Sequence, residues 1–576
     1  MKPLQNPALS VRLPVWRARF LLLLVMFGFV ILAARAFYLQ GMHRGFLQQK
    51  GETRYARMVE ISAYRGRVTD RFGEPLALST PVESVWAVPS DAALSPPQRM
   101  KLARALRVDA QDLRKRLSDN RRDFVYLKRQ LPPQQAARVV ELDLPGVFLQ
   151  REYRRYYPAA EVSAHVVGFT GVDDNGQEGI ELAYQDILAG KPGSRRVIQD
   201  RRGRVVEDVE SIRAPQQGVE VALSIDQRIQ YLAFRELKNA IAQNEARAGS
   251  IVVADVNTGE VLALANWPSF NPNNRDTLQT ERARNRAVVD LFEPGSTLKP
   301  FTIAAALEAG LVRPGSMIDT EGGHFMVGNR VIRDVHPEGM LTVSQVIQKS
   351  SNVGSAKMAM RLPPASLWNM LSNVGFGTQT RVGFPGEASG RLRPHQSWKP
   401  IEQATMSYGH GISVSLIQLA RAYSVFATDG ELIPFTLLRR TESAEGRRVM
   451  SVATARAVRK MLESVTQAGG TATRAQVAGF RVAGKTGTAH KLVSGTYAPD
   501  RYLSSFVGFA PASQPRLVIA VLLDEPGGEH YYGGEVAAPV FSTVMAGALR
   551  LMGITPDARL DQAVVPQSVS AAEKKA

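Results

Sequence analysis

Three short motifs contain side chains that could together carry out acyl transfer. They are Ser296-Thr297-Leu298-Lys299, Ser350-Ser351-Asn352 and Lys485-Thr486-Gly487-Thr488. A serine hydroxyl attacks a carbonyl carbon and forms an ester when a nearby base removes its proton. The motifs supply such a serine, two lysines and a second hydroxyl for proton transfer, and a glycine beside which a substrate backbone could lie. Their combination predicts chemistry through a covalent serine ester.

The first and third motifs are far more specific than the second. Ser296 begins the only S-x-x-K in the chain, and Lys485 begins the only K-[ST]-G. S-x-N occurs three times, starting at Ser118, Ser269 and Ser350, and only the last lies between the other two motifs. Order and spacing therefore select Ser350-Ser351-Asn352 as the second motif.

The residues around Ser296 have the pattern of a helix start. Pro294-Gly295 breaks the chain, and the apolar run 301–307 that follows stops before Gly310. Positions i and i+3 share one face of a helix, so Lys299 is expected beside the Ser296 hydroxyl. The helix N-terminus also favours the negative charge of a developing oxyanion.

The third motif is predicted to lie on a strand of an antiparallel sheet. A mixed α+β domain with one sheet and helices is expected from about residue 221 to 555, closed by a helix at 540–552. The predicted strands cover 250–255 and 260–265, which flank a hairpin turn, and then 479–485, 505–510 and 517–523.

With these motifs and their surroundings, the chain resembles the class B penicillin-binding proteins, most closely the division-specific (FtsI-type) peptidoglycan D,D-transpeptidases of Gram-negative bacteria. The resemblance implies an α+β serine penicillin-recognising transpeptidase fold, an antiparallel sheet with helices. An elongated mixed pedestal domain and one transmembrane helix would precede it. Similar stretches run almost end to end, at Arg65–Ala77, Arg154–Pro158, Gly176–Glu181, Asp290–Ser296 and Tyr531–Gly534.

The resemblance also implies roles for individual residues. Ser296 would attack the penultimate D-alanine of a stem peptide, with Lys299 as its base. A free lysine titrates near ~10.4, and burial together with the charge of Lys485 would lower that pKa. The implied catalytic residues are Ser296, Lys299, Ser350, Asn352 and Lys485, with the backbone N–H groups of Ser296 and Thr488 as the oxyanion hole. The implied substrate-binding residues are Thr486, Gly487, Thr488, His490, His410, Tyr502, Tyr531 and Tyr532. No metal or organic cofactor is expected.

An apolar segment near the N-terminus predicts a membrane anchor. Residues 20–34 are apolar without interruption, and after Arg35 the run continues to residue 39, which as a helix spans roughly 30 Å. Basic residues without acidic ones precede it, so a cytoplasmic N-terminus is expected. The alternative is a cleaved signal peptide with a poor site at Ala34-Arg35-Ala36.

We expect five segments along the chain. They are a cytoplasmic tail at 1–19, the anchor at 20–39, a non-catalytic pedestal at 40–220 for dimerisation or partner docking, the transpeptidase domain at 221–555 and a disordered tail at 556–576. The pedestal contains no plausible catalytic set, and a simple spacer remains its alternative. The expected location is the bacterial inner membrane, crossed once, with the catalytic domain in the periplasm.

Composition excludes some classes of protein. The chain of 576 residues has no cysteine, which rules out disulfide scaffolds and thiolate metal sites. Its net charge of +18 invites a nucleic-acid hypothesis, but no zinc, helix-turn-helix or RNA-binding signature is present. Residues 101–160 carry 14 Lys and Arg against 7 Asp and Glu, which predicts a solvated basic surface near anionic lipid or wall material.

Several functions and partners follow from these expectations. The expected partners are peptidoglycan stem peptides, β-lactam antibiotics and the cytoplasmic membrane, together with a glycosyltransferase and other division proteins through the anchor and pedestal. The alternatives are a D,D-carboxypeptidase, a β-lactamase, a non-catalytic division scaffold and a condition-specific paralogue of the division enzyme.

Two residues depart from the pattern of the division-type relatives. His490 stands where they tend to carry Lys or Arg, and His410 stands where they tend to carry Tyr. Strand alternation places His490 on the same face as Thr488, near a substrate carboxylate. An ordinary histidine titrates near ~6.5, so this contact would strengthen in acid. Neutral drift on a solvent-lined rim is the alternative.

Overall fold

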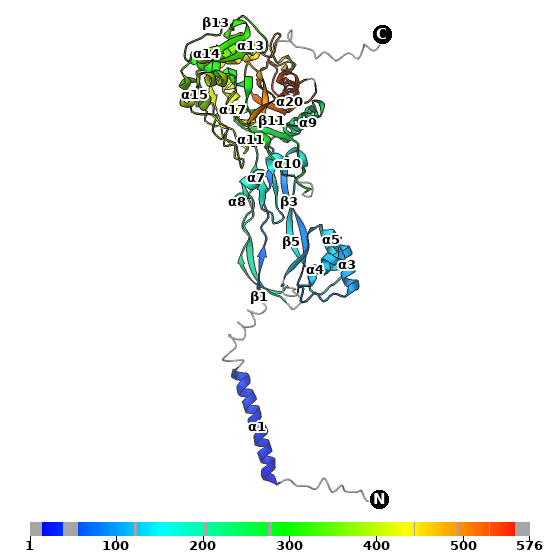
Figure 1. The fold of residues 1–576 in the computed structure, drawn as a ribbon. Helices are drawn as coiled ribbons and strands as arrows, with labels where there is room; N and C mark the ends of the chain where they lie inside the picture. Colours follow the sequence, from blue (N-terminus) through cyan, green and yellow to red (C-terminus); the bar gives the residue numbers. More distant parts are fainter. Residues whose placement is uncertain are drawn as a thin grey trace, which may run out of the picture. The chain divides into compact units, whose positions relative to one another are not determined.

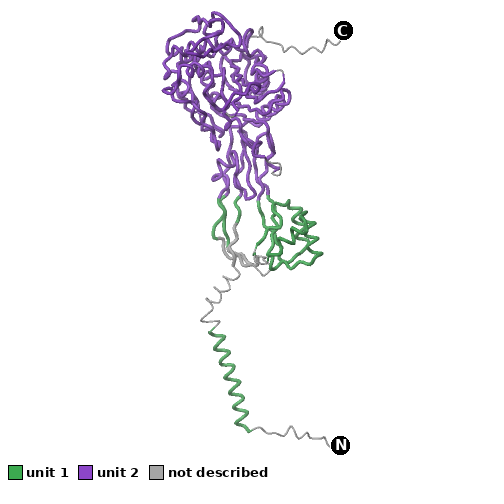
Figure 2. Tube along the Cα trace, in the orientation of Figure 1, with its two compact units in different colours: residues 1–63, 81–152, 191–216 green, residues 64–80, 153–190, 217–576 purple. Residues whose placement is uncertain are grey.

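The computed structural model describes residues 14–38, 56–119, 122, 124–199, 205–274, 279–442, 444–493, 495–528 and 530–558. The chain divides into two compact units, shown in different colours in Figure 2. Unit 1 comprises 1–63, 81–152 and 191–216, and unit 2 comprises 64–80, 153–190 and 217–576. The expected pedestal at 40–220 is therefore shared between both units. Most of each expected terminal tail, 1–13 and 559–576, lies outside the described residues.

The predicted anchor forms one long apolar helix. Helix α1 runs from Val15 to Phe37, with Pro14 at its N-cap and no buried residue (Figure 1). It begins five residues before the apolar run at Phe20, because Trp16, Arg17 and Arg19 are compatible with helix and with the polar edge of a bilayer. Its length and composition are sufficient for one membrane crossing.

An uncleaved anchor makes a direct prediction. Protein purified from membranes should retain the residues up to Phe20, and deletion of residues 1 to about 40 should give a soluble fragment that still binds penicillin. N-terminal sequencing and a sedimentation assay test both expectations. A mature N-terminus at Phe37 would instead identify the segment as a cleaved signal.

Unit 1 contains a helical cluster and a small antiparallel sheet. The helices α3 (Pro96–Leu106), α4 (Ala110–Leu117) and α5 (Pro133–Val140) bury leucines and valines in a core shared with strand β4 (Val125–Leu131). Ser95 caps α3 through a capping box, and Asp109 caps α4. The remaining strands of this unit, in sheet order, are β1 (Ala56–Ile61), β8 (Gly193–Gln199) and β9 (Val205–Arg213).

Three of the family-like stretches meet at one buried charge cluster in unit 2. Arg65 Nε lies 2.7 Å from one oxygen of Glu181, and Arg155 Nε lies 2.6 Å from the other. All three side chains are fully buried, and Arg65 also donates to the Asp174 carbonyl. Removing one partner of such a cluster leaves an uncompensated buried charge, so these segments must keep all three residues.

Short elements surround this cluster. The strands are β2 (Val68–Thr69), β3 (Pro75–Ala87), β5 (Val147–Tyr156), β6 (Phe169–Thr170), β7 (Gly176–Glu178) and β10 (Val221–Ala222), of which β3 and β5 continue into unit 1. The helices are η3 (Ala160–Val162), α6 (Ala164–Val167), α7 (Gly179–Ala183) and α8 (Gln185–Leu188).

A five-stranded antiparallel sheet forms the centre of the C-terminal part of unit 2. Its order is β12-β11-β21-β20-β19, and the bounds are β11 Ala248–Asp255, β12 Val261–Trp267, β19 Ala483–Val493, β20 Thr496–Ala510 and β21 Leu517–Asp524. The predicted hairpin and the predicted run of three antiparallel strands are confirmed. Strands β11 and β21 are buried along almost their whole length, so helices must cover both faces.

Helices α9 (Gln227–Gln243) and α20 (Ala538–Leu551) pack on each other and on the sheet, and α17 (Leu416–Ala427) is buried among β11, β20 and β21. The predicted closing helix is therefore α20, and the predicted α+β fold class is confirmed.

The other helices are α10 (Thr280–Ala283), α11 (Arg286–Val289), η5 (Gly295–Leu298), α12 (Lys299–Glu308), η6 (Glu321–Gly323), α13 (Val343–Lys349), α14 (Asn352–Met360), α15 (Pro364–Asn373), η7 (His395–Ser397), α16 (Pro400–Met406), α18 (Val452–Ser464), η8 (Thr473–Ala475) and α19 (Gly533–Val536). Short ribbons are formed by β13 (Met317–Asp319) with β16 (Met340–Thr342), β14 (His324–Val327) with β15 (Arg330–Arg333), and β17 (Glu431–Leu432) with β18 (Arg447–Arg448).

Candidate active site

Ser296 lies in a 3₁₀ turn rather than in the first turn of an α-helix. The turn η5 covers Gly295–Leu298, and the α-helix α12 begins only at Lys299. Residues three apart eclipse one another in a 3₁₀ turn, so Lys299 is brought directly beside Ser296. The Lys299 Nζ lies 3.0 Å from Ser296 Oγ. The predicted pairing is present, and the tighter turn shortens the distance between the two side chains.

Lys299 also contacts the second motif. Its Nζ lies 3.0 Å from Ser350 Oγ and donates to the Ser350 carbonyl as well. Ser350 ends α13 in the left-handed region, with φ +62° and ψ +40°, a conformation that a serine adopts only where its surroundings enforce it. This backbone turns the Ser350 side chain and carbonyl toward Lys299. The Lys299 amino group therefore contacts two serine hydroxyls.

The loop that carries Ser350 is held by Asp334, which follows β15. One carboxylate oxygen accepts from Ser351 Oγ at 2.6 Å, and the other accepts from the backbone N–H groups of Asn352 and Val353. The last two N–H groups begin α14, so Asp334 caps that helix. Sequence reasoning missed Asp334, since no motif or local pattern connects it with a serine 17 residues further along the chain.

The two lysines of the site are both fully buried. Burial, followed by the nearby charge of Lys485, holds the pKa of Lys299 well below its ordinary value, and the Asp334 carboxylate partly opposes this. Burial alone lowers the pKa of Lys485 to about 7. The predicted direction for Lys299 and both predicted causes agree with the structure. A neutral amine beside Ser296 is what a general base requires.

Strand β19 presents the third motif to the serine turn. Lys485 Nζ lies 3.2 Å from Thr486 Oγ1, which in turn lies 3.1 Å from Thr471 Oγ1. Thr488 Oγ1 accepts from the Gly533 N–H at 3.1 Å, which leaves the Thr488 hydroxyl hydrogen to donate elsewhere.

A glycine at position 487 is required for packing within the protein as well as for the approach of a substrate. A Cβ at this position would lie 2.5 Å from Ser505 Oγ and 2.9 Å from the Pro294 carbonyl. Because Pro294 immediately precedes the η5 turn, a side chain here would push β19 away from the nucleophile. The glycine is thus needed for β19 to pack closely against the serine turn.

Three of the predicted substrate-binding tyrosines form one stack. Tyr502 and Tyr531 lie 4.0 Å apart at 15°, and Tyr531 and Tyr532 lie 4.5 Å apart at 29°. His490 extends the stack, since its ring lies 4.7 Å from Tyr502, its partner in the β19–β20 register. His490 Nδ1 lies 3.1 Å from the Ala498 carbonyl, which points to a proton on Nδ1 and leaves Nε2 toward solvent.

His410 belongs to a separate polar group that begins three residues before the nucleophile. Its Nδ1 lies 3.9 Å from Glu293, and its ring lies near those of Tyr408 and Tyr497. Tyr497 Oη contacts the same carboxylate at 2.9 Å. Burial lowers the pKa of His410, Glu293 raises it, and the charges of Lys299 and His490 lower it further. The two predicted histidines are thus within electrostatic range of each other, and His410 is also within range of Lys299.

Asn352 makes a contact within the protein that the sequence did not predict. Its side-chain Nδ2 donates to the Arg333 carbonyl at 2.9 Å, which anchors β15 to the start of α14. The amide oxygen is the part that remains to meet a substrate amide N–H.

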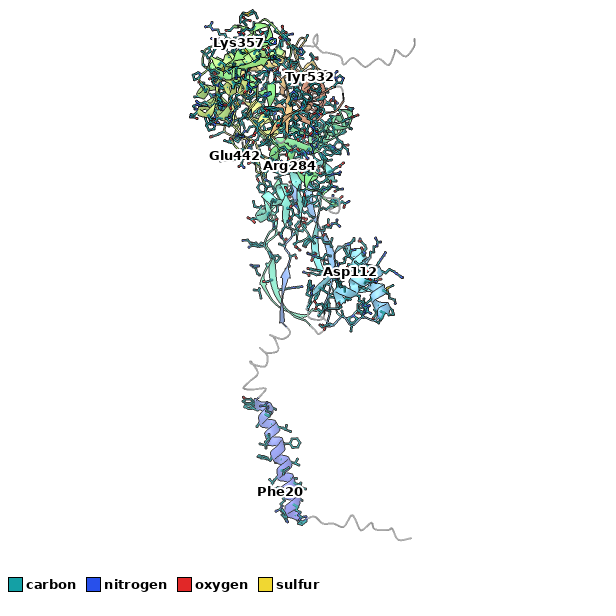
Figure 3. All side chains as sticks on the ribbon, viewed as in Figure 1. Phe20, Asp112, Arg284, Lys357, Glu442 and Tyr532 are labelled. Carbon is teal, nitrogen blue, oxygen red and sulfur yellow. The ribbon has the colours of Figure 1, made fainter. Side chains whose placement is uncertain are left out.

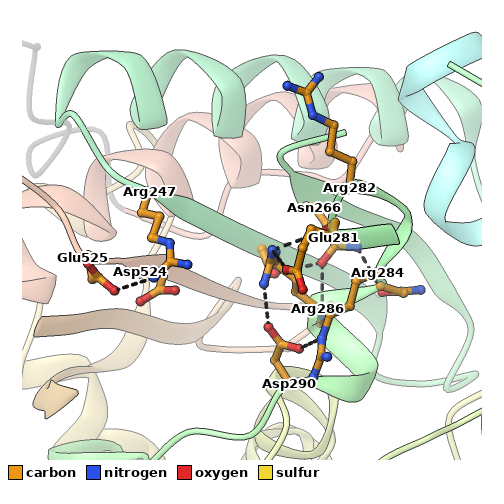
Figure 4. Close-up of polar contacts among 12 residues, drawn as sticks. Arg247, Asn266, Glu281, Arg282, Arg284, Arg286, Asp290, Asp524 and Glu525 are labelled. Atoms are coloured by element: carbon orange, nitrogen blue, oxygen red, sulfur yellow. Dashed lines mark hydrogen bonds and ion pairs between the residues drawn. The ribbon is translucent and has the colours of Figure 1, made fainter. Parts of the chain in front are cut away.

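A cavity of about 600 Å³ adjoins this group, with His490 and Glu293 in its lining. Its other charged residues are largely paired with one another (Figure 4). Arg284 and Arg286 converge on Asp290, and Lys491 bridges Asp524 and Glu525. The arginine pairs lie within the segment that leads toward the η5 turn, and the Lys491 pairs join β19 to the end of β21.

Comparison with known proteins agrees with this geometry. The family model described as penicillin binding protein transpeptidase domain matches residues 249–546, and the model of the penicillin-binding protein dimerisation domain matches residues 60–223. The chain belongs to the class B penicillin-binding proteins, with a dimerisation and a transpeptidase domain. The family assignment made from the motifs is confirmed.

Named relatives cover almost the whole chain. A probable peptidoglycan D,D-transpeptidase PenA of Neisseria gonorrhoeae is 43% identical over 95% of both chains. The peptidoglycan D,D-transpeptidase FtsI of Escherichia coli is 42% identical over 94% of this chain and 93% of its own. A solved transpeptidase domain of Burkholderia pseudomallei penicillin-binding protein 3 is 47% identical, covers 58% of this chain and 98% of its own, and superposes with a TM-score of 0.55.

Proposed function

We propose that this protein is a peptidoglycan D,D-transpeptidase that cross-links stem peptides at the division septum through an acyl-enzyme on Ser296. The observation that carries the proposal is the position of Lys299 Nζ, 3.0 Å from both Ser296 Oγ and Ser350 Oγ. A buried amine with a depressed pKa that touches two hydroxyls can take a proton from one and return it through the other.

The reaction has two balanced halves. Ser296 Oγ attacks the carbonyl carbon of the penultimate D-alanine while Lys299 takes its proton, and the backbone N–H groups of Ser296 and Thr488 hold the oxyanion. The C–N bond breaks, and the terminal D-alanine leaves with a proton relayed by way of Ser350. An amine of a second stem peptide then attacks the ester, loses a proton to the same relay, and releases Ser296 as a new amide forms.

Other residues of the site bind the substrate. The hydroxyls of Thr486 and Thr488 hold the terminal carboxylate of the stem peptide or the carboxylate of a β-lactam, with Lys485 beside them. Asn352 positions the substrate amide through its free oxygen. The stacked tyrosines and His490 form a wall along the acyl part of the substrate.

Product analysis tests the reaction. The full-length protein is incubated with glycan strands that carry pentapeptide stems, and the digested products are separated by mass. We expect cross-linked dimers in amounts that match the released D-alanine. Shortened monomers without dimers would identify a D,D-carboxypeptidase, and failure to form a penicillin adduct would identify a non-catalytic scaffold.

The septal role rests on the similarity to FtsI of Escherichia coli. We infer a cytoplasmic N-terminus, a periplasmic catalytic domain, and contacts with a glycosyltransferase and other division proteins through the anchor and pedestal. Depletion of the protein should produce filaments without septa. Normal division after depletion would favour a paralogue that acts under other conditions.

His490 supports a prediction about that alternative. The His490 ring lies beside Tyr502, and His410, Glu293 and Lys491 are the charged groups around it. Histidine is the side chain type whose charge ordinarily changes between pH 5 and 8. If His490 contacts a β-lactam carboxylate, acylation of the native protein relative to His490→Arg should therefore rise from neutral to mildly acidic pH. Both proteins lose Lys299 as a base to the same extent in acid, so this effect cancels in the ratio of their two acylation rates. A flat ratio would assign His490 to neutral drift.

A further inference from the structure

Basic residues are concentrated in one helical part of unit 1. Residues 96–140, here called the basic module, contain twelve Lys and Arg against four Asp and Glu. This module of 45 residues therefore carries +8 of the net charge of +18 on the 576-residue chain. It contains helices α3, α4 and α5 (Figure 1) and strand β4. Such a charge density creates a positive potential that extends about a Debye length, ~8–10 Å, into solution.

Half of the twelve cations of the module are exposed and have no carboxylate partner in the described part of the chain. Arg116 pairs with Asp112, which Figure 3 labels on the outside of α4, and Arg122 pairs with Asp119. The exposed cations of the module that form no ion pair with a carboxylate among the described residues are Lys101, Arg104, Arg107, Arg114, Lys115 and Arg138. Exposed cations without carboxylate partners repel one another only weakly in water and remain available to an anionic surface.

Large apolar side chains are exposed on the same module. Met100 on α3 is 55% exposed, Val140 on α5 is 59% exposed and Phe124 is 42% exposed. Met100 is followed at once by Lys101 and then, one turn on, by Arg104, so apolar and cationic side chains share the exposed side of α3. Basic residues combined with exposed apolar ones are typical of segments that lie at the boundary between headgroups and acyl chains.

The connection to α1 limits how far the start of β1, and with it the unit that contains this module, can move from a bilayer in which α1 is inserted. Residues 39–55 connect α1 to β1, and a connection of 17 residues reaches at most about 60 Å. A surface held within that distance of a bilayer meets it at a high effective concentration, so weak contacts suffice. Each basic residue close to an acidic bilayer contributes favourably, and several together bind measurably.

We propose that the basic module binds the acidic phospholipid headgroups of the membrane in which α1 is anchored. Its unpaired cations contact lipid phosphates, and Met100, Phe124 and Val140 enter the headgroup layer. This second attachment restricts the motion of the pedestal about its single anchor. It requires the anchor, but it does not require the transpeptidase reaction.

The absence of cysteine allows a clean test. Gln111→Cys in the full-length protein provides one labelling site on the exposed side of α4. The donor-labelled protein is reconstituted through α1 into bilayers that contain a small amount of acceptor-labelled lipid. One set of bilayers is made of phosphatidylcholine alone, and the other contains about a third phosphatidylglycerol. We expect energy transfer to increase about twofold or more in the acidic bilayer and to fall back in about 0.5 M salt.

A pair of charge variants separates the module from general charge effects. The first carries glutamine at four module positions, Lys101, Arg104, Arg114 and Lys115. The matched control carries glutamine at four exposed cations of unit 2, Arg313, Arg330, Lys460 and Arg550. Only the first should lose the response to phosphatidylglycerol, and both should keep penicillin labelling. Equal energy transfer in the two bilayers, or a response to phosphatidylglycerol that survives in the first variant, would overturn the proposal. An acidic protein surface would then be the better candidate for what binds the module.

Discussion

Replacing Ser296 by alanine is expected to abolish covalent penicillin labelling completely. The hydroxyl is the atom that attacks, and no other hydroxyl of the site can take over its position beside both Lys299 and the η5 backbone. The Ser296 side chain is only partly buried, so the folded protein should persist with an unchanged thermal transition. Gel fluorescence with a labelled penicillin, followed by mass spectrometry of the modified peptide, measures the result.

The matched control is Ser351→Ala. Ser351 lies in the second motif but donates to Asp334 rather than to Lys299, so its loss should slow labelling without stopping it. Adduct formation on any serine other than Ser296 would show that the nucleophile has been assigned wrongly. Label that stays with Ser296→Ala although mass spectrometry finds no modified serine would point to non-covalent retention of the label.

The sequence predicted the parts of the site that depend on local periodicity. Lys299 stands three residues from Ser296, and any helical turn places the two side chains together. Strands β11, β12 and β21 and the end of β20 were predictable because apolar runs between turn residues indicate buried strands, whereas β19 was placed through the K-T-G motif. The type of turn at Ser296 was not predictable, since the difference between a 3₁₀ turn and an α-helix depends on packing rather than on composition.

Contacts between segments that are distant in the sequence could not be predicted from local sequence patterns. Nothing near Asp334 shows that it caps α14 and holds Ser351, because that contact exists only after β14 and β15 have formed a ribbon. The burial of Arg65 with Glu181 and Arg155 likewise joins three segments that only the family resemblance had singled out. The assignment of catalytic and substrate-binding roles remains a prediction, since geometry alone does not measure a rate.

Removing Lys299 should be nearly as damaging as removing Ser296. Lys299→Ala deletes the only amine within hydrogen-bond distance of Ser296 Oγ in the described part of the chain. General bases contribute about 10²–10⁴-fold, so the acylation rate constant for a β-lactam should fall by about that factor. The two residues act on one step, and the double variant should therefore be no slower than Ser296→Ala. A Lys299→Ala protein that acylates within a few-fold of the native rate would exclude this base.

The pH dependence distinguishes a base from a structural lysine. Only the neutral amine accepts a proton, so acylation should fall as the pH drops below the pKa of Lys299. That pKa is held down partly by the charge of Lys485 and held up partly by Asp334. In Lys485→Ala the acid limb of the acylation profile should therefore move to higher pH, and in Asp334→Asn it should move to lower pH.

Opposite shifts are the decisive result. Both variants should also lower the maximal rate, because Lys485 lies beside Thr486, the proposed binding residue for the substrate carboxylate, and Asp334 holds the Ser350 loop. Loss of structure would reduce the rate at every pH without moving the limb, whereas a change in the charge beside Lys299 moves it in a direction fixed by the sign of the charge removed. The Lys485 pKa of about 7 adds a constraint, since its charge acts on Lys299 only below that pH. If the acid limbs of the acylation profiles of Lys485→Ala and Asp334→Asn both coincide with that of the native protein, Lys299 is not the titrating base. The proton of Ser296 must then leave by another route.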